Sequence, residues 1–281
     1  MGLAQYINRL FKSSSGLETH SSQETLQIPI ELYKGFGSFS IIPRVYEKEL
    51  DKKYGIVLRK LKNGKPMSFR KDLRKNISFN EGYGHSLYKI EDRILKKYSS
   101  VPGFCSMDID SMEDLSKHIR DIHEISYSHY AWAKEANLEG SFPNSCCGSS
   151  SRNICLTLMD KGYPNSSIVS NGEHDHTYVA LPFLLREKRE KGFVIVDPTS
   201  DQLFTDKKNA PRNNLFVFFG GRWSYETDWG DGGDLFPYDR GESGFSNLHT
   251  LRKHPDSWIY MEEEEIGKYF REVFKNPVKL K

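Results

Sequence analysis

The chain lacks the features that mark several large classes of protein. Its 281 residues include only four cysteines, too few for a disulfide scaffold. No apolar run approaches the roughly 18 to 20 residues needed to span a membrane. The 40 Lys and Arg residues nearly balance the 38 Asp and Glu residues, so there is no broad basic field of the kind that binds nucleic acids.

The N-terminus also lacks a secretory signal peptide, because it has no uninterrupted apolar region and no small-residue cleavage site. We therefore expect a cytoplasmic protein, with non-standard export left open. What the chain does contain, 37% hydrophobic and 13% aromatic residues, is enough apolar material for one large domain or a domain with an added subdomain.

Composition divides the chain into three parts. Residues 1–30 combine a short amphipathic helix with a Ser/Thr-rich linker. That helix either packs on the body of the protein or contacts a membrane surface or a partner. Residues 31–105 look like a β-rich extension, with a hairpin signal at Asn63-Gly64. Residues 106–281 are expected to form the main α+β body.

Local signals place the elements of that body. Ser111, with Asp114 three residues on, predicts the start of a long helix. A second helix should begin after Pro143-Asn144-Ser145 and end at Gly162. Further helices are predicted at 87–98 and 263–274, and strands at 167–170, 176–183, 192–197 and 215–219.

Two patterns resemble metal sites only superficially. The histidines of the long helix, His118, His123 and His129, are spaced five and six residues apart, whereas ligand pairs on a helix need three or four. We expect them at the surface or its boundary. The Asp- and Gly-rich stretch 228–234 lacks the spacing of a calcium loop and is expected to be a flexible loop.

Two adjacent cysteines open the second helix. Helical spacing places Cys147 on one stripe with Ile154 and Leu158, while the stripe of Cys146 is polar beyond that cysteine. Because a helix buries its apolar stripe, we expect Cys147 to face the sheet and Cys146 to point away. The dipole and the backbone N–H groups at a helix start favour a thiolate and can hold an oxyanion.

Other interpretations of these cysteines stay open. Most unpaired cysteines are small buried packing residues, and Cys155 fits that description. Cys146, Cys147, Cys155, His174 and His176 are also residue types that bind metals. However, Cys147 and Cys155 lie about 12 Å apart along the helix axis and no zinc-finger spacing is present. We expect neither a metal nor a cofactor.

A predicted hairpin brings a histidine and an aspartate together. The strand that begins at His176 and the strand that ends at Asp197 are joined by the charged connection 184–191, which is short enough to imply antiparallel pairing. If the two residues are directly opposite, their Cβ atoms are about 5 Å apart. Asp197 could then orient the imidazole toward the Cys147 thiol. His174 is the competing histidine, and Asp197 could instead be only a strand terminator.

These residues resemble the transglutaminase-like branch of the papain-like cysteine enzymes, over roughly residues 140 to 205. In that family a helix opens on the cysteine, with small or apolar residues four and seven positions on and a glycine about fifteen on. A histidine then heads a strand, and an aspartate ends the next strand in Asp-Pro-Thr. The matching residues here are Cys147, Ser151, Ile154 and Gly162, then His176-Thr177-Tyr178-Val179, then Asp197-Pro198-Thr199.

The resemblance implies an α+β core with the nucleophile helix packed on an antiparallel sheet. It further implies a Cys147 nucleophile, a His176 general acid and base, and Asp197 to orient the histidine. Asn144 is a candidate oxyanion donor. The expected function is a hydrolase that cleaves amide bonds of a protein or peptide through a thioester, as a protease or a deamidase. The alternatives are transglutaminase-type acyl transfer to an amine, and a non-catalytic binding module on the same scaffold.

Overall fold

The computed structural model describes residues 30–34, 49, 52–53, 56–60, 84–135, 142–171, 176–200, 215–220, 244–253, 268–269 and 271–280. Several sequence predictions fall outside these residues. They are the N-terminal helix and linker, the hairpin turn at 63–64, His174, the stretch 228–234 and the first half of the helix predicted at 263–274.

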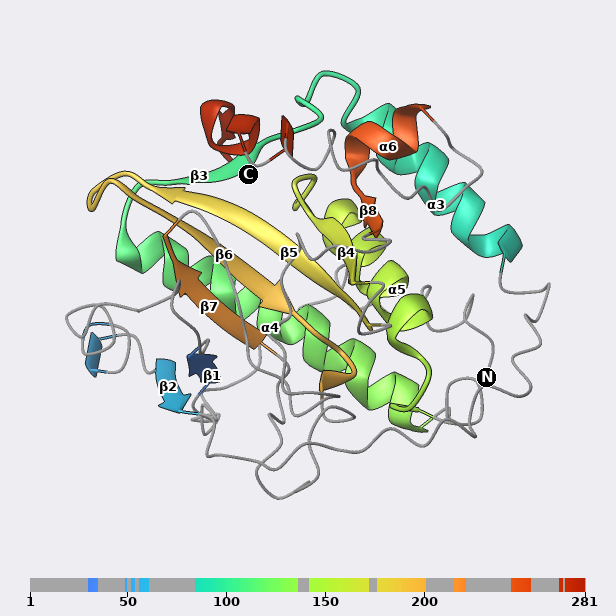
Figure 1. Ribbon diagram of the computed structural model, residues 1–281, viewed down its shortest axis with the longest axis horizontal. Coiled ribbons are helices and arrows are strands. Elements are labelled where there is room, and N and C mark those ends of the chain that lie inside the picture. The colour runs from blue at the N-terminus through green and yellow to red at the C-terminus, as the bar shows by residue number, and fades with distance from the viewer. Residues whose placement is uncertain are drawn as a thin grey trace, which may run out of the picture.

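A mixed β-sheet forms the centre of the molecule (Figure 1). Its strands are β1 (Ile30–Lys34), β2 (Ile56–Lys60), β3 (Ser106–Ile109), β4 (Ser167–Asn171), β5 (His176–Leu185), β6 (Glu190–Val196), β7 (Leu215–Phe219), β8 (Gly244–Ser246) and β9 (Pro277–Val278). They are arranged in the order β2-β1-β7-β6-β5-β3-β9, and β4 pairs with both β5 and β8. The four strands predicted after Gly162 are therefore confirmed as β4 to β7.

The sequence led us to expect an antiparallel sheet, but the observed sheet is mixed. Strands β4 to β7 pair antiparallel; short connections join β4 to β5 and β5 to β6, and the longer stretch 197–214 joins β6 to β7. Strand β3 instead lies parallel to β5, and β1 lies parallel to β2 and β7. Long stretches of chain separate these partners, so they are free to pair in either direction. The prediction of an antiparallel sheet was thus correct for its centre and wrong for its edges.

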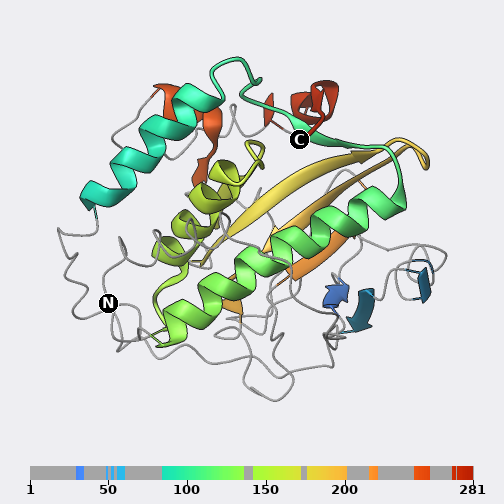
Figure 2. The same ribbon diagram turned by 180° about the vertical axis from the view of Figure 1, so that it is seen from behind.

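Helices α3 (Gly84–Lys97), α4 (Met112–Glu135), α5 (Cys147–Asp160) and α6 (Leu248–Lys253) surround this sheet. Seen from behind, α4 runs along the sheet and α5 lies beside it (Figure 2). The main core forms where α4 and α5 bury their apolar faces against the central strands. It includes Leu115, Ile119 and Ile122 of α4, Ile154 and Leu158 of α5, and Val179, Leu181, Val194 and Val196 of the hairpin, all fully buried. None of the helices in the described part of the chain is long and apolar enough to cross a membrane.

The ends of α4 and α5 follow from the residues that the sequence singled out. The backbone N–H of Asp114 donates to the Ser111 hydroxyl oxygen at 3.2 Å, and that hydroxyl donates back to the Asp114 carboxylate at 2.9 Å. At the other signal, Gly162 has φ +115°. Its N–H donates to Met159 and the next N–H donates to the Leu158 carbonyl at 2.9 Å, the two bonds of a Schellman motif. Both helix ends are confirmed.

Candidate active site

The turn before α5 presents two cysteines in different surroundings. Cys147 is the first residue of the helix and is partly exposed, whereas Cys146 is the N-cap residue and is fully buried. Cys146 makes no side-chain capping hydrogen bond. Ser145 before it has φ +58°, in the left-handed region that few residues other than glycine adopt. Such backbone strain is concentrated at functional sites.

The thiol of Cys146 makes contacts inside the protein. It packs with Ala133 of α4 and with Phe142, and it donates to the carbonyl oxygen of Asn144 at 3.2 Å. The expectation that Cys147 lies on the buried stripe and Cys146 points away was wrong about burial, since Cys146 is the fully buried cysteine and Cys147 is partly exposed. The reason is that Ala133 of α4 and Phe142 cover Cys146. The contact with Asn144 involves only the main chain of that residue, so Asn144 stays a predicted oxyanion donor.

His176 and Asp197 are joined directly. The His176 Nε2 atom lies 2.7 Å from Asp197 Oδ2, and both side chains are fully buried. The β5–β6 register pairs Val179 with Val196, so its continuation places Tyr178, not His176, opposite Asp197. The expected direct opposition was therefore wrong by two residues. The contact forms along the diagonal of the pair, a distance that long side chains can bridge.

A residue missed by the sequence reasoning fixes the other carboxylate oxygen. The backbone N–H of Thr199 donates to Asp197 Oδ1 at 3.1 Å, and its hydroxyl lies 3.4 Å from the same atom. Thr199 is fully buried. An aspartate that accepts from the backbone two residues on is a recurrent turn, so the sequence Asp197-Pro198-Thr199 does carry this signal. Asp197 is thus held at both oxygens.

The thiol of Cys147 and the imidazole of His176 also interact, since hydrogen bonding and charge at Cys147 contribute to the raised pKa of His176. Because Nε2 faces Asp197, the nitrogen left for the thiol is Nδ1. The structure thus brings together all three residues that the sequence grouped: a partly exposed thiol, a buried imidazole and a buried carboxylate.

The electrostatics of this row favour a charged imidazole. Burial alone would lower the pKa of His176, but the charge of Asp197 and the hydrogen bonds to Asp197 and Cys147 outweigh it and raise that pKa to about 10. At neutral pH the imidazole is therefore protonated, which is the form that can pair with a thiolate and later donate a proton.

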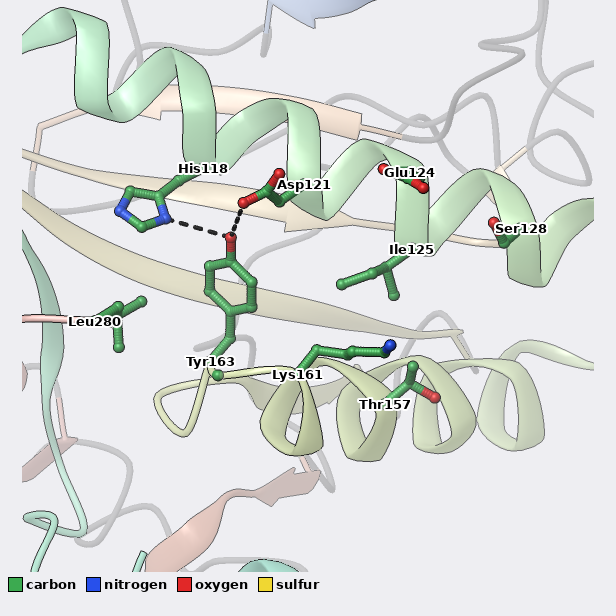
Figure 3. Close-up of a pocket in the computed structure, with 10 residues that line it drawn as sticks. His118, Asp121, Glu124, Ile125, Ser128, Thr157, Lys161, Tyr163 and Leu280 are labelled. Atoms are coloured by element: carbon green, nitrogen blue, oxygen red, sulfur yellow. Dashed lines mark hydrogen bonds between the residues drawn. The ribbon is translucent and has the colours of Figure 1, made fainter. Parts of the chain in front are cut away.

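A second polar cluster lies at the far end of α5 (Figure 3). Between α4 and α5 is a cavity of about 270 Å³, where the Tyr163 hydroxyl lies 3.2 Å from His118 Nδ1 and donates to Asp121 at 3.4 Å. Burial and Asp121 raise the pKa of Tyr163, and burial lowers that of His118, so both groups are neutral. The nearest lining residue of this cavity on α5, Thr157, is ten helical steps from Cys147, about 15 Å along the axis. The cavity contains no nucleophilic thiol.

One expectation about histidines was wrong. His129 is 4% exposed, and burial lowers its pKa to about 3, so it is a neutral interior residue rather than a surface one. It lies on α4 close to the residues that pack against α5. The spacing of histidines in the sequence could not show that other parts of the chain bury this position. Among the described residues, no group of three or more His, Cys, Asp or Glu side chains is arranged to hold a metal ion.

Comparisons with protein-family models, curated proteins and solved structures find no match to this chain. The chemistry of the site is therefore argued from its own geometry.

Proposed function

We propose that this chain is a cysteine-dependent hydrolase that acts on amide bonds of proteins or peptides through a thioester intermediate. The observation that carries the proposal is the row Cys147–His176–Asp197, in which Cys147 is partly exposed and interacts with His176, and His176 and Asp197 are fully buried and hydrogen-bonded to each other. A packing cysteine needs no imidazole, and a structural histidine needs no thiol. The order nucleophile, base and orienting carboxylate is what acyl transfer requires.

The first half of the reaction forms the thioester. The Cys147 thiolate attacks the carbonyl carbon of the amide, a C–S bond forms, and the carbonyl oxygen becomes an oxyanion. The backbone N–H groups at the start of α5 point toward this region and are suited to stabilise that charge, with Asn144 as a further candidate donor. The His176 imidazolium then gives its Nδ1 proton to the departing nitrogen, and the C–N bond breaks.

The second half releases the acyl group. Neutral His176 takes a proton from water, the water oxygen attacks the thioester carbonyl, and the C–S bond breaks to regenerate the thiolate. Asp197 stabilises the imidazolium and fixes the ring so that Nδ1 faces the sulfur. If an amine replaced water, the same steps would give acyl transfer. We favour hydrolysis because nothing in the sequence identifies an amine-acceptor site.

The proposal includes the fold relation suggested by the sequence resemblance. Helix α5 packs against β4 and β5, and the cysteine lies at the helix start beside the first residue of β5. That arrangement supports a papain- or transglutaminase-like core within the mixed sheet.

Alkylation by iodoacetamide tests the nucleophile. Labelling of each cysteine is followed by peptide mass spectrometry between pH 5 and 9. We expect Cys147 to react fastest, because a neighbouring imidazolium activates a thiol. Cys105 is an internal control, because burial raises its pKa to about 12. If Cys147 reacts no faster than an ordinary exposed thiol, the chain is a non-catalytic binding module.

A second assay separates the possible reactions. The protein is incubated with a pool of unstructured peptides rich in Gln and Asn, together with a fluorescent primary amine. New peptide N-termini indicate a protease, ammonia release without cleavage indicates a deamidase, and incorporation of the amine indicates a transferase. The Cys147→Ala variant is the blank, and any product that persists in this variant does not come from the proposed site.

A further inference from the structure

A buried hydroxyl connects the two elements that carry the thiol and the imidazole. The Ser151 hydroxyl on α5 donates to the backbone carbonyl oxygen of Thr177 on β5 at 2.8 Å. Ser151 is fully buried and Thr177 is 8% exposed. Ser151 lies one helical turn after Cys147, and Thr177 is the immediate neighbour of His176. The bond therefore links the nucleophile helix to the histidine strand about 6 Å along the axis from the thiol.

The two edges of β5 are paired to different extents near its start. Strand β5 pairs with β6 only from Val179 onward, because β6 ends at Val196 and the chain then turns at Asp197-Pro198. Strand β4 supports the other edge of β5 up to His176. Between α5 and the first residues of β5, the contact from Ser151 to the Thr177 carbonyl is a directional one, whereas apolar packing permits small shifts.

Other contacts of α5 attach it to α3. Arg152 pairs with Glu91 of α3 at 2.5 Å, and Asp160 pairs with Arg93 at 2.8 Å. Lys97 of α3 also donates to the Asp160 carbonyl at 2.7 Å. These ion pairs attach the helix to α3 and do not reach β5. The separation between the start of α5 and the start of β5 therefore depends on contacts on the side of α5 that faces the sheet.

We propose that Ser151 is a positioning residue that sets the separation of the Cys147 thiol and the His176 imidazole. This inference rests on the proposed function, since it assigns a purpose to the same site. Without the hydroxyl, the helix start can move relative to β5 while the apolar core stays intact. A displacement of about 1 Å between reacting groups typically costs about 100-fold in rate.

The test compares the pH profile of Cys147 alkylation in the full chain and in variants. In Ser151→Ala we expect labelling of Cys147 at pH 6 to 7 to slow by about 10-fold or more, toward the rate of an ordinary thiol. The matched control is Thr157→Val, which removes another hydroxyl from the same helix. Thr157 donates to the Asn153 carbonyl within α5 at 2.7 Å, so its loss should leave the profile unchanged.

Two further comparisons separate positioning from general damage. Threonine and valine side chains have nearly the same shape, but only threonine has a hydroxyl. The labelling profile of Ser151→Thr should therefore resemble that of the parent more closely than the profile of Ser151→Val does. This pair also serves if Ser151→Ala is too unstable to label. In a His176→Gln background, Ser151→Ala should have no additional effect on labelling, because its effect acts through the imidazole.

The outcomes distinguish the inference from the function on which it rests. If Cys147 of the parent labels as an ordinary thiol, the proposed function fails. If the parent labels at low pH and Ser151→Ala does the same, only the positioning role fails. An equal shift in Thr157→Val, or an equal effect of Ser151→Ala in the His176→Gln background, would also overturn the positioning role.

Discussion

Raising the pH from 7 to 8.5 should lower the stability of this protein through His176. The pKa of His176 is raised to about 10 in the folded state, from an unfolded value near 6.5, because Asp197 and Cys147 together outweigh the effect of burial. A raised histidine pKa gives stabilisation that is complete below pH 6.5 and is lost as the pH rises through the folded value. The window for His176 is therefore about pH 6.5 to 10.

The proton count follows from the two states of His176. In the folded protein its imidazole is protonated between pH 7 and 8.5, because its pKa of about 10 lies above this range. In the unfolded chain an ordinary histidine is mostly neutral over the same range. Unfolding therefore releases about one proton from His176.

The magnitude follows from the proton count. A difference of one proton lowers the free energy of unfolding by about 1.4 kcal/mol per pH unit, or about 2 kcal/mol from pH 7 to 8.5. Urea unfolding at several pH values measures it, with His176→Gln as the control that should lose the slope. If His176→Gln keeps the slope of the parent, the charge state assigned to His176 is wrong.

Three other substitutions have expected outcomes. Cys147→Ala should abolish turnover in the peptide assay with the far-UV circular dichroism intact, whereas Cys146→Ala should keep most activity; an inactive Cys146 variant would mean that the wrong thiol was chosen. Asp197→Asn should slow turnover by about 10²- to 10⁴-fold and slow Cys147 alkylation, and an unchanged labelling profile would leave a Cys-His dyad. Gly192→Ala should lower the free energy of unfolding by at least about 1 to 3 kcal/mol, because its Cβ would lie 2.2 Å from the Phe183 ring; an unchanged urea midpoint would contradict this packing.

Local signals in the sequence predicted the elements that depend on neighbouring residues. The bond between Ser111 and Asp114, the Gly162 helix end and the β5–β6 hairpin all form within a few residues to a few tens of residues of chain. The parallel neighbours of the hairpin could not be predicted in the same way. Strand β3 comes before two helices, and β1 lies far from β7 in the chain, so their pairing depends on tertiary packing that no local pattern encodes.

The residues that hold the site in place were missed for a related reason. Ser151 looked like an ordinary small residue on the apolar stripe, because its partner is a backbone carbonyl 26 residues away on β5. Thr199 was noted only as part of Asp-Pro-Thr. Backbone carbonyls and N–H groups leave no trace in the sequence, so a side chain whose purpose is to bond them looks like packing.

The grouping of His176 with Asp197 survived an error in register, and the size of the error explains why. The connection between the strands is a four-residue turn, and Leu185 pairs with Glu190. Direct opposition of His176 and Asp197 would require a register shifted by two residues. Because side chains alternate between faces with a period of two, an even shift keeps both residues on the same face and moves them from direct to diagonal neighbours. A shift of one residue would have placed them on opposite faces. The prediction therefore depended on whether the register was shifted by an even or an odd number of residues, more than on the exact alignment. The 2.7 Å contact shows that the imidazole and the carboxylate together span the diagonal.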